Sequence, residues 1–236
     1  MDTTAKNILI ICYSLSGQTS NLLARLTDGL ESAGVKVTIE RLRPVKRLRF
    51  PFKSIRATAV MMLLTFFRKR IPIAPLSNKC KGCYDLIILA GPTWSYHPSG
   101  PVLSLLDRDG STLFASQSVI TLISCRGYWR THWFSLCALL KQNGASVVNG
   151  ITFTHPCREP WRTIGVFLKI AGRSPEKSPC IGKHYPRYGH GKEQLEEAYR
   201  FGIMLGQALT EGKDLASLNF QTKLAVARGG NSNSAG

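Results

Sequence analysis

Five short strand-like runs are spaced along the chain, and segments with helical periodicity lie between them. The first run, 8–13, is continuously apolar and rich in β-branched residues, which is typical of a strand buried on both faces. Strands of this kind belong to parallel sheets that are covered by helices on both sides. We therefore predict an α/β fold, a doubly wound five-stranded parallel sheet with helices on both faces. Its strands are expected at 8–13, 35–42, 84–90, 118–124 and 145–153.

The segments between these runs provide the crossover helices that parallel strands need. Residues 20–33 place leucines at positions 22, 23, 26 and 30, which is a helical spacing, and Gly34 follows where a helix would end. Periodicity does not fix the order of the strands in the sheet. Further helices are expected at 54–70, 102–106, 132–142 and 192–209.

The net charge of +17 is concentrated in two segments. Between residues 41 and 81 there are 12 Lys or Arg and no acidic residue, and between 154 and 192 there are 8 against 2 acidic residues. The rest of the chain is close to neutral, with 11 basic and 12 acidic residues. A regional excess of this kind indicates an anionic partner, which is a lipid surface, a nucleic acid or a phosphate-bearing ligand.

Both basic segments interrupt the regular alternation of strands and helices, and we interpret them as insertions into a single domain. The domain is expected to cover 1–213, with insertions at about 43–83 and 154–191. The remaining residues, 214–236, are predicted to be a partly disordered tail, because the last nine are of low complexity.

The first insertion carries an apolar stretch of 11 residues, 57–67, between Arg56 and Arg68. This stretch is too short to span a bilayer, but it fits an interfacial helix on anionic lipid, or a lid over an apolar substrate. Residues 161–173 have a similar character. A buried extra helix and a homodimer interface remain as alternatives. Nucleic acid is disfavoured as a partner, because aromatic residues are poorly interleaved with the basic ones.

The seven cysteines show no disulfide framework, and this favours a reducing cytoplasm, with peripheral association at the inner face of the membrane as an option. No signal peptide precedes the first strand-like run. Cys80 and Cys83 form a solitary C-x-x-C, and no second pair lies at zinc spacing. We therefore expect no metal site.

Three loops follow predicted strand ends, at 14–19, 91–100 and 125–130, where parallel sheets bind their ligands. The first reads Ser14-Leu15-Ser16-Gly17-Gln18-Thr19 and leads directly into a helix. Backbone N–H groups, hydroxyls and a glycine at a helix start can hold a phosphate, although the same residues also suit an ordinary capped helix. Dinucleotide and nucleoside-triphosphate fingerprints are absent.

Two segments carry a resemblance to a known family. The segment ILIICYSLSGQT resembles the first strand and FMN-phosphate loop of the flavodoxin family. The segment YDLIILAGPTWSYHPSGPV is similar to the third strand and flavin loop of flavodoxin-like NAD(P)H-dependent reductases. The resemblance covers about 7–42 and 84–153, together with the terminal helix, and it implies a flavodoxin-like fold that binds FMN.

The resemblance also implies roles for individual residues. A ring held by loop backbone and aromatic side chains is desolvated, which tunes its chemistry; ordinary surface-loop packing is the alternative for the aromatic residues. The implied phosphate ligands are Ser14, Ser16, Gly17, Gln18 and Thr19. The implied neighbours of the isoalloxazine ring are Pro92, Thr93, Trp94 and Tyr96, with Arg126, Gly127 and Tyr128 closing its other edge.

Hydride transfer through a flavin needs positioning more than an acid or base, so no catalytic side chain is required. His97 is a weak candidate for a proton donor, followed by Arg126 and His132. Electron-transfer flavodoxins are usually smaller and acidic, so the basic insertions favour an enzyme. We expect an FMN-dependent oxidoreductase that passes electrons from NAD(P)H to a quinone-like or other apolar small molecule. The alternatives are an FMN-binding electron-transfer module for a protein partner and a non-enzymatic membrane-surface protein on a flavodoxin scaffold.

Overall fold

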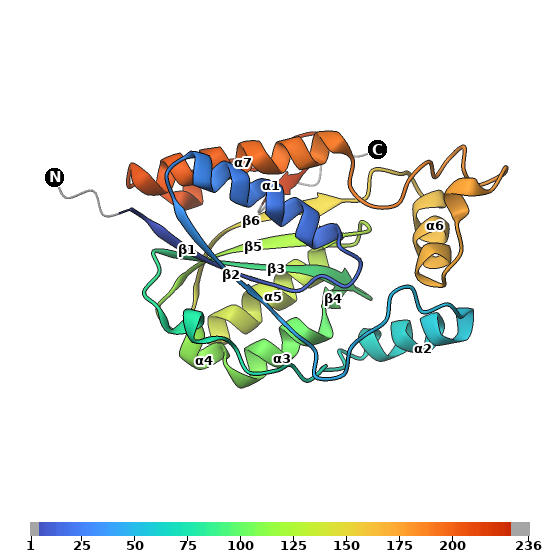
Figure 1. Ribbon diagram of the computed structural model, residues 1–236, viewed down its shortest axis with the longest axis horizontal. Helices are drawn as coiled ribbons and strands as arrows, with labels where there is room; N and C mark the ends of the chain where they lie inside the picture. The colour runs from blue at the N-terminus through green and yellow to red at the C-terminus, as the bar shows by residue number, and fades with distance from the viewer. Residues whose placement is uncertain (1–4, 228–236) are drawn as a thin grey trace.

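The computed structural model describes residues 5–227, and a parallel sheet forms its centre (Figure 1). The five predicted strands are confirmed, and each pairs in parallel with its neighbours. Their order, β2-β1-β3-β5-β6, is the flavodoxin-like doubly wound arrangement. Their bounds are Asn7–Cys12 for β1, Lys36–Arg41 for β2, Leu86–Trp94 for β3, Ser118–Cys125 for β5 and Ser146–Thr154 for β6.

Two antiparallel strands of two residues each extend this sheet beyond the prediction. Strand β4, His97–Pro98, folds back on the end of β3. Strand β7, Val226–Ala227, pairs with β6 at the edge of the sheet. These short strands escaped the sequence analysis because two residues carry no periodicity.

Helices cover both faces of the sheet, as predicted (Figure 1). Helices α1, Gln18–Ser32, and α7, Lys192–Thr210, lie side by side on one face. Helices α3, Gly100–Arg108, α4, Gly110–Leu113, and α5, Arg130–Gln142, lie on the other. The alternation of β1 explains both layers, since Ile8 and Ile10 pack beneath α1 and α7 while Leu9 and Ile11 pack on the opposite side.

The two predicted insertions meet beyond the carboxyl ends of the strands (Figure 1). The first forms α2, Ile55–Phe66, and the short helix η1, Asn78–Lys81. The second forms α6, Trp161–Ile170, and η2, Pro175–Lys177. Helices α2 and α6 contact each other, and the Phe52 N–H donates to the Ile170 carbonyl at 2.9 Å. Segments more than 100 residues apart therefore build one structure at the end of the sheet where ligands bind.

Residues 214–227, which we assigned to a tail, pack against the domain instead. They form η3, Leu215–Ser217, and β7, and the Phe220 side chain is fully buried. The Asn149 amide of β6 donates to the carbonyls of Leu215 and Leu218, both at 2.9 Å. The rest of the expected tail, 228–236, lies outside the described residues. Among residues 5–227, no helix has the length and apolarity needed to cross a bilayer.

Two glycines allow α1 and α7 to cross at very short range. A Cβ atom on Gly29 would lie 2.1 Å from the Tyr199 carbonyl oxygen, and one on Gly202 would lie 2.2 Å from the Leu26 carbonyl oxygen. These contacts are with backbone, which cannot rotate away. The crossing therefore fixes the position of α1 relative to α7.

We predict that Gly29→Ala lowers the free energy of unfolding by about 1–3 kcal/mol, because the added methyl group overpacks the crossing. Chemical denaturation monitored by circular dichroism measures this change. Glu31→Ala, on the exposed side of the same helix, is the matched control and should change stability by less than about 0.5 kcal/mol. Equal effects of the two substitutions would contradict the close crossing.

Candidate functional site

A cavity of about 320 Å³ opens at the carboxyl ends of the strands, between the sheet and the insertion helices. Strands β1 and β3 are neighbours in the sheet, but α1 leaves β1 toward one face and α3 follows β3 on the other. The cavity therefore lies at a topological switch point, where doubly wound sheets bind ligands. Its volume falls within the range of about 300–1,000 Å³ that is usual for cofactor sites.

All the residues implied to bind cofactor line this cavity except two glycines of the same loops. Gly17 stands between the lining residues Ser16 and Gln18. Gly127 instead contacts the Arg162 guanidinium, which a Cβ atom would meet at 2.6 Å. The residues that the structure brings together are Ser14, Ser16, Gln18, Thr19, Pro92, Thr93, Trp94, Tyr96, Arg126 and Tyr128.

The first loop ends in a helix start whose backbone donors are not satisfied. Gly17 is the residue that precedes α1, and its φ of 84° lies in the left-handed region that glycine favours. The Ser14 hydroxyl accepts from the Ser20 N–H at 3.3 Å. Within residues 5–227, the N–H groups of Gly17, Gln18 and Thr19 make no hydrogen bond. Three donors at the positive end of a helix form a binding site for an anion.

The charge of the cavity wall fits the same kind of ligand. None of the described residues that line it is acidic. The Arg126 guanidinium lies 5.5 Å from the centre of the Tyr128 ring and makes no ion pair within residues 5–227. A cavity whose described wall holds one unpaired guanidinium and no carboxylate favours anionic over cationic ligands.

Aromatic side chains join the three loops around the cavity. The Tyr13 and Trp94 rings meet edge to face at 5.6 Å, which connects the end of β1 with the end of β3. The Tyr96 and Tyr128 rings meet at 5.5 Å, which connects the second loop with the third. Tyr96 has a φ of 74°, an unfavourable value for a residue with a side chain. The two-residue turn between β3 and β4 thus holds a strained tyrosine at the cavity mouth.

A buried polar network supports the inner wall, and the sequence analysis missed it. Ser124 Oγ lies 2.8 Å from His190 Nε2, and His190 Nδ1 lies 3.3 Å from Gln194 Oε1. The Gln194 amide nitrogen donates to the Thr154 and Leu224 carbonyls, so its oxygen faces the histidine. The proton of the neutral imidazole therefore sits on Nδ1, and Ser124 donates to Nε2.

The same network holds the first turn of α1. The His190 backbone N–H donates to Gln18 Oε1 at 3.0 Å, and the Gly189 N–H donates to His155 Nε2 at 3.2 Å. Burial lowers the pKa values of both His155 and His190 to about 4, so both are neutral near pH 7. His190 is consequently too weak a base to activate Ser124 as a nucleophile. The network positions the loops that face the cavity.

The histidine candidates for proton donation do not reach the cavity. His97 lies in β4 outside the cavity wall, and burial followed by the Arg68 charge lowers its pKa. His132 is buried behind the wall, where its Nδ1 lies 2.7 Å from Thr93 Oγ1. Burial lowers the pKa of His132 to about 3. Of the three weak candidates, the structure places Arg126 alone in the wall.

Sulfur chemistry finds little support at the site. Cys125 lines the cavity, but burial raises the pKa of its thiol to about 12, so it carries no charge at neutral pH. Cys80 and Cys83 are both free thiols. Within residues 5–227, no three His, Cys, Asp or Glu side chains gather closely enough to hold a metal ion.

The two insertions contribute a large apolar part of the cavity wall, and no sequence motif predicted that these residues line it. Phe50 stacks on Tyr188 with ring centres 6.0 Å apart, so one insertion meets the other above the cavity. The basic and apolar composition of both insertions was visible in the sequence. The sequence did not show that the two insertions fold over the same strand ends. The additional lining residues include Phe50, Phe52, Thr58, Met61, Met62, Thr65, Phe66, Val166, Phe167 and Ile170.

We predict that His132 makes stability depend on pH. Its pKa in the folded state lies below the ordinary value of 6.5, so the unfolded chain takes up a proton first as the pH falls. Stability is therefore lost as the pH falls below about 6.5. Between pH 7 and pH 5 the free energy of unfolding of the unmodified protein should fall by about 2 kcal/mol more than that of the His132→Gln variant. Denaturant titrations at both pH values measure this difference. Parallel losses in the two proteins would contradict a neutral buried imidazole.

No protein-family model and no curated protein matches this chain. Solved structures with a similar arrangement include a flavoprotein from Lactobacillus acidophilus NCFM in complex with FMN, at 22% identity and a TM-score of 0.49, over 63% of this chain and 93% of that one. Flavodoxin 1 from Bacillus cereus matches at 13% identity and a TM-score of 0.46, over 88% of this chain and 98% of that one. A WrbA-like flavodoxin from Agrobacterium tumefaciens matches at 15% identity and a TM-score of 0.46, over 89% of this chain and 100% of that one. At these values the flavodoxin-like assignment of the fold rests on the strand order itself.

Proposed function

We propose that the cavity binds FMN and that the protein is an FMN-dependent oxidoreductase. One observation carries the proposal: free N–H groups at the start of α1 border the same cavity as the aromatic wall of Trp94, Tyr96 and Tyr128. The cavity lies at the β1/β3 switch point, where flavodoxin-like sheets hold FMN. A ligand with a terminal phosphate and a flat ring matches both ends of this site.

The phosphate end would be held by the loop 14–19. The N–H groups of Gly17, Gln18 and Thr19 supply hydrogen bonds, and the Ser16 hydroxyl supplies a further donor. One left-handed glycine with a single turn of free donors suits a monophosphate. A dinucleotide would require the longer glycine-rich turn that this sequence lacks.

The ring end would be held between the second and third loops. Trp94 and Tyr128 offer apolar surface, and Arg126 offers a positive charge. When bound, the flavin supplies hydride and electron transfer. A guanidinium beside the ring favours a reduced anionic form over the neutral oxidised form, which raises the reduction potential. The neutral His132 stays behind Thr93 and contributes no charge to this environment.

The electron acceptor is apolar in this proposal. Met61, Met62, Val166 and Phe167, all from the insertion helices, line the cavity. These side chains exclude water and offer no hydrogen bonds, which suits a quinone-like molecule. NAD(P)H is the proposed donor. No lining side chain has to take or release a proton for hydride transfer itself.

An electron-transfer module for a protein partner is the second candidate. Exchange of electrons between proteins needs an accessible ring edge, whereas the stacked rings of Phe50 and Tyr188 form part of the wall of this cavity. The wall that the two insertions add therefore favours a small-molecule acceptor over a protein.

The first test compares FMN with riboflavin, which lacks the phosphate, by fluorescence titration of the purified chain. FMN should bind at least about 100-fold more tightly, because charged hydrogen bonds at a helix start contribute several kcal/mol. Ser16→Asp places a negative charge in the phosphate loop and should weaken FMN at least about 10-fold while leaving riboflavin nearly unchanged.

Ser111→Asp is the matched control, since Ser111 is exposed in α4, away from the cavity. It introduces the same charge and should leave both affinities as they are. Equal affinity for FMN and riboflavin would contradict the proposed phosphate site. Failure to bind either ligand would overturn the proposed function as a whole.

The second test measures oxidation of NADH and NADPH by the FMN-loaded protein, with and without a short-chain quinone. An enzyme of the proposed type should turn over with at least one nucleotide, and the quinone should raise the rate at least about 10-fold. A carrier would show no nucleotide oxidation until a separate reductase is added. That result would favour the electron-transfer module over the enzyme.

A further inference from the structure

We propose that the outer face of α2, with its basic flanks, docks on the surface of an anionic lipid bilayer. This inference goes beyond the proposed redox function and does not depend on the cofactor. It concerns the face of the insertion helix that points away from the cavity. We define the docking face by its exposed apolar residues Val60, Leu63 and Phe67.

Helix α2 is inverted relative to an ordinary surface helix. Its buried residues are two threonines, Thr58 at 0% and Thr65 at 6% exposure. The docking face is more than half exposed at every position, from 56% at Val60 to 73% at Phe67. Surface helices normally bury their apolar side chains and expose the polar ones. A continuous exposed apolar face on a helix marks an interaction surface.

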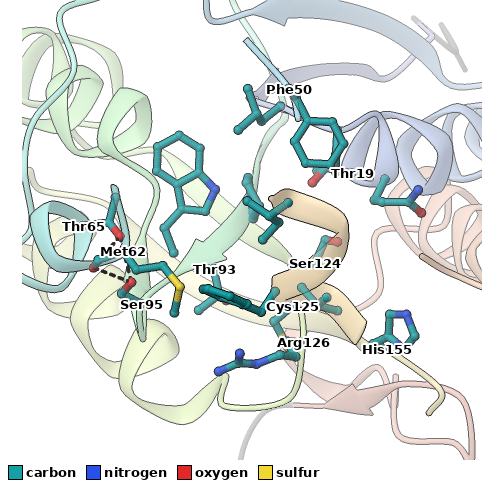
Figure 2. Close-up of a pocket in the computed structure, with 18 of the residues that line it drawn as sticks. Thr19, Phe50, Met62, Thr65, Thr93, Ser95, Ser124, Cys125, Arg126 and His155 are labelled. Atoms are coloured by element: carbon teal, nitrogen blue, oxygen red, sulfur yellow. Dashed lines mark hydrogen bonds between the residues drawn. The ribbon is translucent and has the colours of Figure 1, made fainter. Parts of the chain in front are cut away.

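Polar contacts fix this orientation from the inner side (Figure 2). The Thr65 and Ser95 hydroxyls lie 2.8 Å apart, and Ser95 Oγ donates to the Met62 carbonyl at 2.9 Å. These contacts join α2 to the turn at the end of β3. Thr58 and Thr65, one heptad apart, face the cavity together. Rotating the helix to bury its apolar face would break the contacts to Ser95.

The charges around the docking face select an anionic partner. Lys53 and Arg56 lie at the start of α2, and Lys69 follows its end. All three are exposed, and none makes an ion pair within residues 5–227. The surrounding segment, 41–81, contains no acidic residue. Each basic residue near an anionic membrane surface contributes about 1 kcal/mol, and exposed Phe and Leu side chains enter the interface between headgroups and acyl chains.

A second copy of the chain is a poorer occupant than lipid. Two docking faces brought together would also bring their basic flanks together, without a carboxylate in either segment to offset the repulsion. Nucleic acid would satisfy the charges, but it offers nothing to the exposed Leu63 and Phe67. A bilayer with anionic headgroups satisfies both features at once.

The inner side of the same helix lines the cavity through Met61, Met62 and Thr65. A docked α2 would therefore lie between the bilayer surface and the cavity. Helix α6 would lie beside it, with Ile164 exposed on its surface. An apolar acceptor dissolved in the membrane would then have a short path to the site.

The test is co-sedimentation of the full chain with vesicles of phosphatidylcholine alone or with 30% phosphatidylglycerol, a composition of about one anionic lipid in three. The protein should bind the anionic vesicles at least about 10-fold more tightly than the neutral ones. The double variant Leu63→Ser with Phe67→Ser should lose at least about 10-fold in affinity for anionic vesicles. Neither residue lines the cavity. A circular dichroism spectrum and a denaturation midpoint like those of the unmodified chain report that the variant is folded.

Phe134→Ser is the matched control, because Phe134 on α5 is 69% exposed and lies on a different part of the surface. It should bind vesicles like the unmodified chain. Lys53→Glu with Arg56→Glu should lower anionic binding and abolish the preference for phosphatidylglycerol. Unchanged binding by the Leu63 and Phe67 variant would overturn the proposal. So would absence of vesicle binding together with a dimer in solution that the same variant dissociates.

Discussion

The unsatisfied N–H groups at the start of α1 are the constraint on which the rest of the cavity depends. A helix start left open inside a protein costs free energy unless a ligand, water or side chain satisfies it. Here Gly17 turns the chain in its left-handed conformation at the start of α1, and the close approach of Gly29 and Gly202 to the backbone of the facing helix fixes α1 against α7. The close helix crossing and the anion site are therefore parts of one arrangement.

The buried network around His190 supports this arrangement from a distant part of the sequence. His190 holds Gln18 through its backbone and Ser124 through its ring, so it connects the start of α1 with the end of β5. Because burial keeps the imidazole neutral, the network can lie beside an anion site without adding a charge. Insertion helices close the other side of the cavity with apolar side chains and two threonines, while further apolar side chains of α2 stay exposed on its outer side.

Sequence periodicity was sufficient for the sheet and for the main helices, because buried parallel strands and amphipathic helices leave strong patterns. Loops that follow strand ends could also be located, so Ser16, Trp94 and Arg126 were found before any coordinates. His190 and Phe50 could not be found, since their roles depend on contacts between residues far apart in sequence. His97 was misleading, because it directly follows Tyr96 in the sequence but does not line the cavity as Tyr96 does. The packing of Phe220 likewise had no local signal.

The most direct measurement of the central claim is the set of backbone amide resonances for Gly17, Gln18 and Thr19 during titration with FMN and, separately, with riboflavin. If these N–H groups hold the phosphate, all three resonances should move downfield with FMN and stay near their original positions with riboflavin, while the Trp94 indole resonance responds to both. Movement of the Trp94 resonance with no response from the three amides would contradict the account, because the ring would then bind without its phosphate at the start of α1.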